Sequence, residues 1–312
     1  MKISIVIPVY NNQGTLAELF AQLERKMQSS DASLDLEYVF VNDGSRDGSW
    51  SVLERLYQQN PGRCVLVDLT RNFGQINALL AGYMHASGDA VVSMSADLQD
   101  PPDIVPSLIR AWREGHKLVA AQRVFRQDGW ITDKTSSLAW TLLRRFAVPS
   151  IPQGGFDFFL MDRLLCNYYI RDPEQNIFMQ GRLLFYGHTP FVIPYERQKR
   201  GSGKSQTSVA RRIKYFVDGF TAYSFLPLRI MSMVGIVLFL FSLLMVGIIF
   251  IYIFVFGSKV EGWASLIVVS LFLGGMQMLS LGVLGEYLWR GIEEVRRRPH
   301  FIVGQVVRKN EL

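Results

Sequence analysis

The sequence predicts an α/β domain built on a mostly parallel sheet with helices on both faces, followed by two membrane-spanning helices. Over residues 3–123, short apolar runs alternate with segments whose apolar residues recur at helical spacing. Near the C-terminus, two long stretches, 230–256 and 263–285, contain no charged residue. Each exceeds the roughly 20 apolar residues that cross a bilayer as a helix, which a buried core helix rarely reaches.

The elements of the α/β part follow from these patterns in chain order. Strands are expected at residues 3–10, 36–43, 64–70, 90–96 and 117–123, with helices at 15–27, 49–60, 73–87 and 102–115. Thr15 and Glu18 have the spacing of a capping box at the start of the first helix. After residue 123 the pattern weakens into a mobile segment and a basic helix, and residues 154–163 then predict a strand leading into a helix.

The strand ends are polar and rich in turn-forming residues. They read PVYNN, VNDGS, DLTRNFG and SADLQD. Ligands of such sheets bind at the carboxyl ends of the strands, so these four segments are the candidate site. A nicotinamide site is excluded because PVYNNQG, after the first strand, is not a G-x-G-x-x-G turn. A P-loop is excluded as well, because RGSGKS lacks the first glycine of that motif.

The charge around the two apolar stretches predicts a hairpin with both ends in the cytoplasm. The connecting loop, residues 257–262, holds one lysine, whereas the outer flanks are basic. The flanking basic residues are Arg211, Arg212, Lys214, Arg229, Arg290, Arg296, Arg297 and Arg298. Because the basic residues cluster there, the net charge of +6 indicates anionic lipid rather than nucleic acid as the partner.

These observations divide the chain into four parts. Residues 1–206 form the catalytic domain, and residues 207–229 a helix lying on the membrane surface. Residues 230–289 hold the two spans, 230–256 and 263–288, and residues 290–312 a basic cytoplasmic tail. The sequences LGG and GVLG in the second span permit close helix packing and hence a homo-oligomer. The two cysteines, Cys64 and Cys166, lack metal-ligand spacing and are interpreted as reduced thiols.

Together the motifs resemble a known family. The segments VIPVYNN, VNDGSRDGS, RNFGQINALLAG, SADLQDPPD and FDFFLMDR occur in this order before the hairpin. The whole chain is thereby similar to the family 2 glycosyltransferases that load a sugar onto a polyprenyl phosphate. That resemblance implies a GT-A fold, a UDP-sugar donor, an undecaprenyl phosphate acceptor, Mg²⁺ or Mn²⁺, and inversion at the anomeric carbon. It also implies a place in the bacterial inner membrane and a role in modifying cell-envelope glycans such as lipopolysaccharide.

The resemblance also assigns roles to individual residues. Those implied to hold the nucleotide sugar are Pro8, Tyr10, Asn11, Asp43, Arg71, Gly74, Ser95, Asp97 and Gln99. Asp97 is the implied metal carboxylate, and Asp157 the implied base. The residues implied to face phosphates or the acceptor are Arg123, Arg126, Arg200, Lys204 and Ser205.

The sequence departs from the family pattern at three positions. Ser95 replaces the usual first aspartate of the metal motif, Phe159 stands where many relatives have arginine, and Gln75 replaces a frequent lysine. Since Mg²⁺ takes one or two carboxylates plus substrate phosphates, Asp97 and the donor diphosphate could still hold it. Two alternatives stay open: transfer to another lipid or glycan acceptor, and a catalytically dead, nucleotide-sugar-binding membrane scaffold, which Ser95 alone supports.

Overall fold

The computed structural model describes residues 1–31, 33–123, 140–141, 144–145, 147–152, 154–171, 178–195, 224, 226–256 and 262–309. The chain divides into two compact units. One unit comprises Met1–Gly219 together with Arg298–Leu312, and the other comprises Phe220–Arg297.

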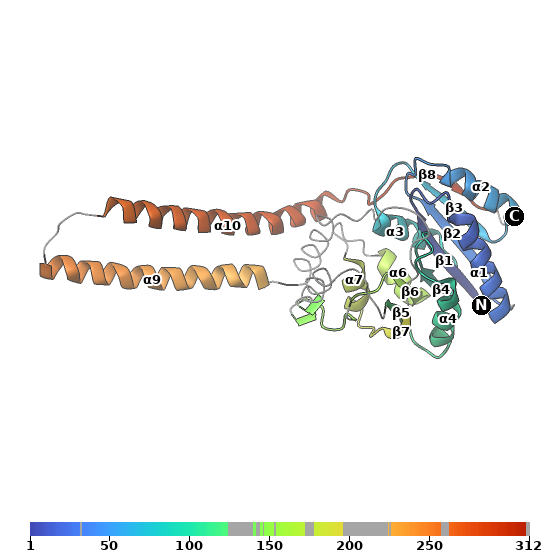
Figure 1. The fold of residues 1–312 in the computed structure, drawn as a ribbon, viewed down its shortest axis with the longest axis horizontal. Helices are drawn as coiled ribbons and strands as arrows, with labels where there is room; N and C mark the ends of the chain where they lie inside the picture. Colours follow the sequence, from blue (N-terminus) through green and yellow to red (C-terminus); the bar gives the residue numbers. More distant parts are fainter. Residues whose placement is uncertain are drawn as a thin grey trace. The chain divides into compact units, whose positions relative to one another are not determined.

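The first unit is built on a sheet whose described strands number eight, in the order β7-β5-β6-β4-β1-β2-β3-β8 (Figure 1). The strands are β1 (Lys2–Val9), β2 (Asp35–Asn42), β3 (Cys64–Leu69), β4 (Ala90–Ser93), β5 (Leu118–Arg123), β6 (Phe158–Asp162), β7 (Phe191–Tyr195) and β8 (Val303–Val307). The helices are α1 (Leu16–Ser30), α2 (Ser49–Gln59), α3 (Gln75–His85), the 3₁₀ turn η1 (Pro102–Ile104), α4 (Val105–Arg113), α6 (Arg163–Arg171) and α7 (Met179–Phe185).

The strand directions confirm the predicted mostly parallel sheet. β1 pairs in parallel with β2, from Lys2 opposite Asp35 to Val9 opposite Asn42, and also with β4. β2 and β3 are parallel, as are β5 and β7. β6 runs antiparallel to β4 and β5, and β8 runs antiparallel to β3. The strands β1 to β5 and β7 therefore all end at one edge of the sheet, which is the edge where β6 begins.

Helices cover both faces of this sheet, as the sequence predicts. On one face, the apolar sides of α1, α2 and α4 belong to the same buried core as Ile3, Ile5 and Ile7 of β1, whose side chains are fully buried. On the other face, α3 packs so closely that a Cβ at Gly82 would clash with Val6 and Val41. The alternation along β1 thus delivers successive residues to the two cores.

The capping box predicted for α1 is wrong. Thr15 stands at the N-cap, but its hydroxyl makes no capping hydrogen bond. The hydroxyl instead donates to the backbone carbonyl of Ala96, at 2.6 Å, in the loop that follows β4. The tertiary partner satisfies the same hydroxyl, and the bond ties the loop after β1 to the loop after β4.

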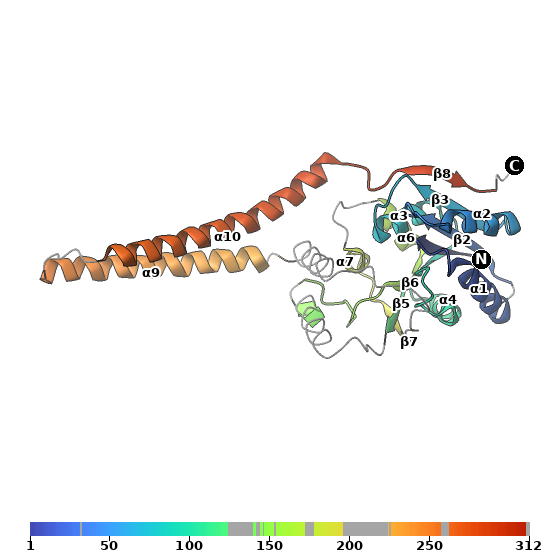
Figure 2. The same cartoon turned by 45° about the horizontal axis from the view of Figure 1, so that its top comes forward.

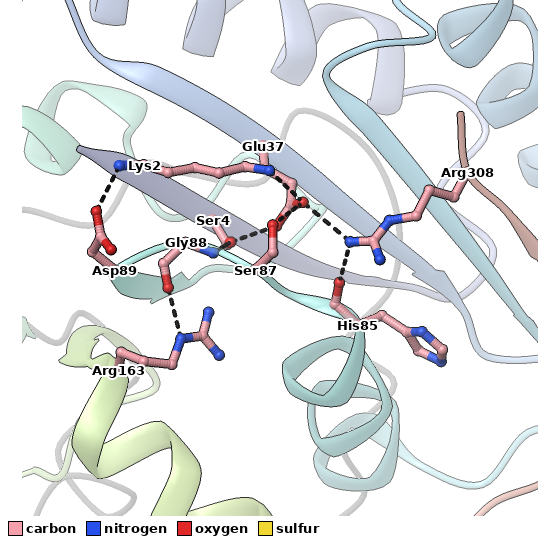
Figure 3. A network of polar contacts seen from close by, with 9 residues as sticks. All are labelled: Lys2, Ser4, Glu37, His85, Ser87, Gly88, Asp89, Arg163 and Arg308. Carbon is pink, nitrogen blue, oxygen red and sulfur yellow. Dashed lines mark hydrogen bonds and ion pairs between the residues drawn. The ribbon is translucent and has the colours of Figure 1, made fainter. Parts of the chain in front are cut away.

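The C-terminal residues contribute an element that the sequence analysis does not include. Residues 303–307, assigned there to a basic tail, form β8 at the edge of the sheet beside β3. Arg308, which follows β8, donates to Glu37 Oε1 at 3.3 Å and to the carbonyl of His85 at 3.1 Å. Figure 3 shows Arg308 reaching a polar cluster around Glu37, so the end of the chain is fastened to the start of β2.

The second unit holds two long helices, α9 (Leu226–Phe256) and α10 (Trp263–Arg296). Both views show them side by side and running in opposite directions (Figures 1 and 2). Within this unit the hydroxyl of Tyr287 donates to the carbonyl of Ser224, at 2.9 Å. Among the residues that the structure describes, none of the helices combines the length and the apolar character needed to cross a membrane.

Both cysteines are free and buried, in agreement with the sequence interpretation. Burial raises the pKa of the Cys64 thiol to about 12 and that of the Cys166 thiol to about 11. Neither thiol therefore ionises near neutral pH, and both behave as small apolar core groups.

Candidate active site

The sheet brings the predicted site residues to one edge. The parallel strands place Tyr10, Asp43, Arg71 and Ser95 just beyond the carboxyl ends of β1 to β4. β5 ends at Arg123 on the same side. Since β6 is antiparallel, Asp157 precedes its start at this edge as well. Residues from Tyr10 to Asp157 thus lie at the same edge of the sheet, as the strand ends predict.

The loops after β1 and β2 are fastened to each other through Asn11. Its backbone N–H donates to Ser45 Oγ at 3.1 Å, and its side-chain Oδ1 accepts from the N–H of Arg46 at 2.9 Å. Asn11 has a φ of 55°, the left-handed conformation that asparagine tolerates better than most residues. The asparagine therefore holds the two loops together, while Pro8 and Tyr10 beside it are partly exposed.

Asp43 is almost completely buried, with 2% of its surface exposed. Its two carboxylate oxygens accept the backbone N–H groups of Phe73, at 2.6 Å, and Gly74, at 2.9 Å. Burial raises the pKa of this carboxyl, and the two backbone N–H groups oppose that shift. Its first task is to hold the start of α3, and a nucleoside could use only its remaining lone pairs.

The loop after β3 presents an arginine and an open backbone. Arg71 is exposed, and its guanidinium lies 4.1 Å from the ring centre of Phe73. Gly74 has a φ of +93°, which disfavours any side chain, and a Cβ there would meet nothing within 4 Å. The loop thus offers a cation beside an unobstructed stretch of backbone, which suits the approach of a phosphate.

The loop after β4 centres on the hydroxyl of Ser95. Ser95 Oγ lies 2.8 Å from Asp97 Oδ1 and 2.7 Å from Asp100 Oδ2, and the Ser95 N–H donates to Asp100 Oδ2 at 3.2 Å. One hydroxyl carries a single hydrogen and can donate to only one of these carboxylates. The close approach of the second carboxylate is one that a cation bound at this loop would stabilise.

The backbone of this loop is strained next to Asp97. Leu98 has a φ of 59°, in the left-handed region, which costs a residue with a Cβ roughly 1–2 kcal/mol. The N–H of Gln99 donates to Asp97 Oδ1 at 3.2 Å. Strain of this kind persists only where surrounding contacts impose it, and it is common at functional sites.

A chain of hydrogen bonds that ends in an ion pair leads from this loop to Asp157. The buried Asp100 accepts from the Tyr195 hydroxyl at 2.8 Å, and that hydroxyl accepts from Arg123 Nε at 3.2 Å. Arg123 Nη2 lies 3.9 Å from Asp157 Oδ2, and Gln180 Nε2 donates to Asp157 Oδ1 at 3.2 Å. The chain joins the implied metal carboxylate to the implied base.

A divalent cation fits the donor set at Ser95. Two carboxylates, those of Asp97 and Asp100, converge on one hydroxyl, and Gln99 Oε1 in the same loop is buried with no hydrogen-bond partner among the described residues. Within the part of the chain that the structure describes, no three His, Cys, Asp or Glu side chains gather into a metal site. The two carboxylates and the amide oxygen of this loop are ligands that suit Mg²⁺ or Mn²⁺ when substrate phosphates supply the remaining oxygens.

Several predicted residues lie outside the described part of the chain, and others were missed. Arg126, Arg200, Lys204 and Ser205 belong to the first group, as does most of the predicted surface helix. Asp100 and Tyr195 are brought into the site although the sequence analysis gives them no role. Asp100 could have been predicted from the sequence, since it follows Asp97 by three residues in the same turn. Tyr195 could not, because only the pairing of β7 with β5 places it beside Arg123.

Comparisons with known proteins identify the family. The model of the family "Glycosyl transferase family 2" matches residues 4–194. The chain is 38% identical over 311 residues to the SfII prophage-derived bactoprenol glucosyl transferase of Shigella flexneri, covering 99% of this chain and 100% of that protein. It is 36% identical over 307 residues to the prophage bactoprenol glucosyl transferase homolog of Escherichia coli K12, covering 98% of this chain and 99% of that protein.

A solved structure supports the fold. A mannosyltransferase from Pyrobaculum calidifontis, in complex with GDP-Man and Mn²⁺, aligns with a TM-score of 0.51 at 21% identity, covering 70% of this chain and 63% of that chain. This likeness concerns the fold of the α/β unit alone, which is the GT-A-like architecture predicted from the sequence. The family match and the near full-length relatives go further: the chain belongs to glycosyl transferase family 2 and is a glycosyltransferase.

Proposed function

We propose that the protein transfers a hexose from a UDP-sugar to undecaprenyl phosphate, with inversion at the anomeric carbon. The observation that carries this proposal is the 38% identity to a bactoprenol glucosyl transferase along 99% of the chain. The similarity extends through the C-terminal helices and is not confined to the family 2 domain. An acceptor that is itself a membrane lipid is consistent with that full-length likeness.

The proposed reaction breaks the bond between the anomeric carbon and the donor diphosphate, and forms a bond to an oxygen of the acceptor phosphate. A phosphate monoester has a second pKa near 6, so the acceptor is largely a dianion at neutral pH. Asp157 then has little need to remove a proton; instead it orients the acceptor or faces the positive charge that develops at the sugar. Asp157 is 55% exposed, so a substrate can reach it.

The basic residues offset the repulsion between two anionic substrates. In this proposal Arg123, whose guanidinium lies 3.9 Å from Asp157, faces the acceptor phosphate, and Arg71 faces the donor. Arg123 is partly buried; burial lowers its pKa, but Tyr195, Asp157 and Asp100 together raise it, so it stays charged. Asp97, with Asp100 close by, would hold Mg²⁺ or Mn²⁺, which neutralises the leaving diphosphate when bound.

We also infer that α9 and α10 anchor the protein in the cytoplasmic membrane, with the loop of residues 257–262 outside. The support for this inference is the sequence: residues 230–256 and 263–285 contain no charged residue, and the likeness to the bactoprenol glucosyl transferase of Shigella flexneri runs through both stretches. Large apolar side chains of α9 are exposed, among them Met233, Ile236, Val237, Leu240, Leu244, Ile251 and Phe254.

The orientation can be tested with a single cysteine. Ser258→Cys should react with an impermeant thiol reagent added to intact spheroplasts, whereas a cysteine at the C-terminus should not. Cys64 and Cys166 are 2% and 0% exposed, so the natural thiols give little background. Labelling of the C-terminal cysteine, with position 258 silent, would reverse the orientation.

The activity itself is tested by incubating membranes that contain the protein with radiolabelled UDP-sugars and extracting the lipids. We expect label in a polyprenyl-linked product with one donor, and none in membranes without the protein. Label in a diacylglycerol or a glycan would replace the proposed acceptor, and the absence of any labelled product across donors would overturn the transfer itself.

A further inference from the structure

Tyr195 joins two parts of the site that are far apart in sequence. It is the last residue of β7, it is 5% exposed, and β7 pairs with β5 so that Tyr195 stands opposite Arg123. Its ring packs edge-on against Phe158, with centroids 5.9 Å apart. The phenol is therefore held in place by sheet pairing and by ring packing, independently of its hydroxyl.

The hydroxyl uses both of its hydrogen-bonding capacities within the site. A guanidinium can only donate and an ionised carboxylate can only accept, so the direction of the chain is fixed. Arg123 Nε donates to the phenol oxygen, at 3.2 Å, and the phenol donates to Asp100 Oδ1, at 2.8 Å. Burial, and next the charge of Asp100, raise the pKa of Tyr195, so the phenol keeps its proton.

The two ends of this chain reach the reacting region. On one side, the second oxygen of Asp100 accepts from the N–H and hydroxyl of Ser95, which also contacts Asp97. On the other side, Arg123 Nη2 lies 3.9 Å from Asp157. Asp100 is only 2% exposed, so a hydrogen bond lost there would leave a buried carboxylate oxygen without compensation.

From this geometry we propose that Tyr195 and Asp100 are positioning residues that set the Arg123 guanidinium beside Asp157 and hold the loop of Ser95 and Asp97. The proposal rests on the proposed transfer reaction and adds that donor and acceptor ends of the site are coupled through one buried phenol. A misplacement near 1 Å of a group that orients substrate can cost about 100-fold in rate. The phenol therefore governs turnover more than donor binding.

The first test removes only the hydroxyl. Tyr195→Phe keeps the ring against Phe158 and should fold. Its matched control is Tyr186→Phe, because the Tyr186 hydroxyl also accepts from an arginine Nε, that of Arg182 at 3.2 Å, and donates to a carbonyl, that of Tyr168 at 3.1 Å. In Tyr195→Phe, kcat should fall by about 10- to 100-fold, while the KM for the UDP-sugar stays within about twofold; Tyr186→Phe should match the wild type in both. Equal losses in the two variants would reduce Tyr195 to a structural residue.

A double-mutant cycle tests whether the effect passes through Arg123. If Tyr195 acts in part by placing that guanidinium, Arg123→Gln already loses that part, and adding Tyr195→Phe should cost less than the same change costs in the wild type. Multiplicative losses in the double variant would overturn the coupling.

A measurement independent of turnover separates this proposal from the proposed function. Amide hydrogen exchange on the full chain should accelerate in peptides covering residues 95–100 and 118–123 of Tyr195→Phe, and not in Tyr186→Phe. Unchanged exchange in both peptides would overturn the positioning role whatever the enzyme's activity. Accelerated exchange in Tyr195→Phe, together with a wild type that transfers no sugar, would instead uphold the coupling and refute the proposed reaction.

Discussion

The two edges of the sheet carry polar clusters of contrasting design. At the edge where β1, β2 and β4 begin, the carboxylate of Glu37 accepts from five donor groups between 2.6 and 3.3 Å: the hydroxyls of Ser4 and Ser87, the Ser87 N–H, Lys2 Nζ and Arg308 Nη2 (Figure 3). At the edge where these strands end, the single hydroxyl of Ser95 faces two carboxylates.

The difference separates a structural cluster from a site. Each oxygen of Glu37 has its hydrogen bonds, and its negative charge faces Lys2 and Arg308, so nothing needs to bind there. Burial alone would raise the pKa of Glu37, but the hydrogen bonds from Ser4, Ser87 and Lys2 outweigh it and lower that pKa to about 2. Around Ser95, by contrast, two carboxylates share one hydroxyl, an arrangement that a bound cation would stabilise.

The largest effect should come from breaking the carboxyl edge at Asp97. Asp97→Ala removes the less buried of the two converging carboxylates, and we expect sugar transfer to fall by at least about 100-fold, as when a single group stabilising transition-state charge is lost. The rate of labelled lipid formation measures it. Asp103→Ala is the matched control, because Asp103 lies in the following turn and pairs with Lys26 at the surface. Wild-type activity in Asp97→Ala would exclude Asp97 from the reaction.

The next effect concerns the amino edge and should appear in stability alone. Glu37→Gln replaces one buried carboxylate oxygen by an NH₂ group, which donates hydrogen bonds. The groups that surround it are themselves donors and need an acceptor there. The difference between the ordinary pKa of 4.5 and the folded value near 2 corresponds to about 3 kcal/mol of stability at neutral pH. We expect Glu37→Gln to have a lower unfolding temperature and an unchanged turnover for each folded molecule. The control variant is Glu54→Gln, on the exposed side of α2, which should unfold at the wild-type temperature.

The pH dependence of unfolding sharpens this second prediction. Because the folded pKa of Glu37 is depressed, its contribution is complete above about pH 4.5 and is lost as the pH falls toward 2. Wild type should therefore lose its stability advantage over Glu37→Gln across that interval. Parallel stability curves for the two proteins down to pH 2 would show that the cluster does not hold the fold as described.

The same contrast explains what could be read from the sequence. The apolar runs fix the central strands because each must bury both faces, and polar residues at the ends of β1 to β4 mark the ligand edge. The chain around Tyr195 could not be foreseen, since it depends on β7 lying beside β5. β8 was missed for a similar reason: it is short, follows a run of arginines, and becomes a strand only by pairing with β3.

Predictions from short sequence motifs also failed where a side chain forms its hydrogen bonds with residues distant along the chain. Thr15 has the sequence of a helix cap but donates to Ala96 instead. Asp43 has the position of a nucleoside ligand, yet both of its oxygens first hold the backbone at Phe73 and Gly74. A sequence identifies the edge at which such residues gather; their partners there come from loops distant along the chain.

The smallest effects on activity should come from substitutions of Ser95 itself. Ser95→Ala removes one neutral hydrogen bond, worth about 1 kcal/mol, and should slow transfer by about fivefold.

Ser95→Asp places a third carboxylate next to Asp97 and Asp100, so without a cation their repulsion should lower the unfolding temperature, and Mn²⁺ should restore it. Calorimetry should find tighter Mn²⁺ binding to Ser95→Asp than to wild type in the absence of UDP, and a smaller difference in its presence, because the diphosphate then supplies the missing oxygens. Turnover need not rise, since a more firmly held metal can slow product release. If Ser95→Asp were as stable as the wild type without Mn²⁺ and insensitive to its addition, the oxygens around Ser95 would not form a cation site, and this edge of the sheet would resemble the edge around Glu37.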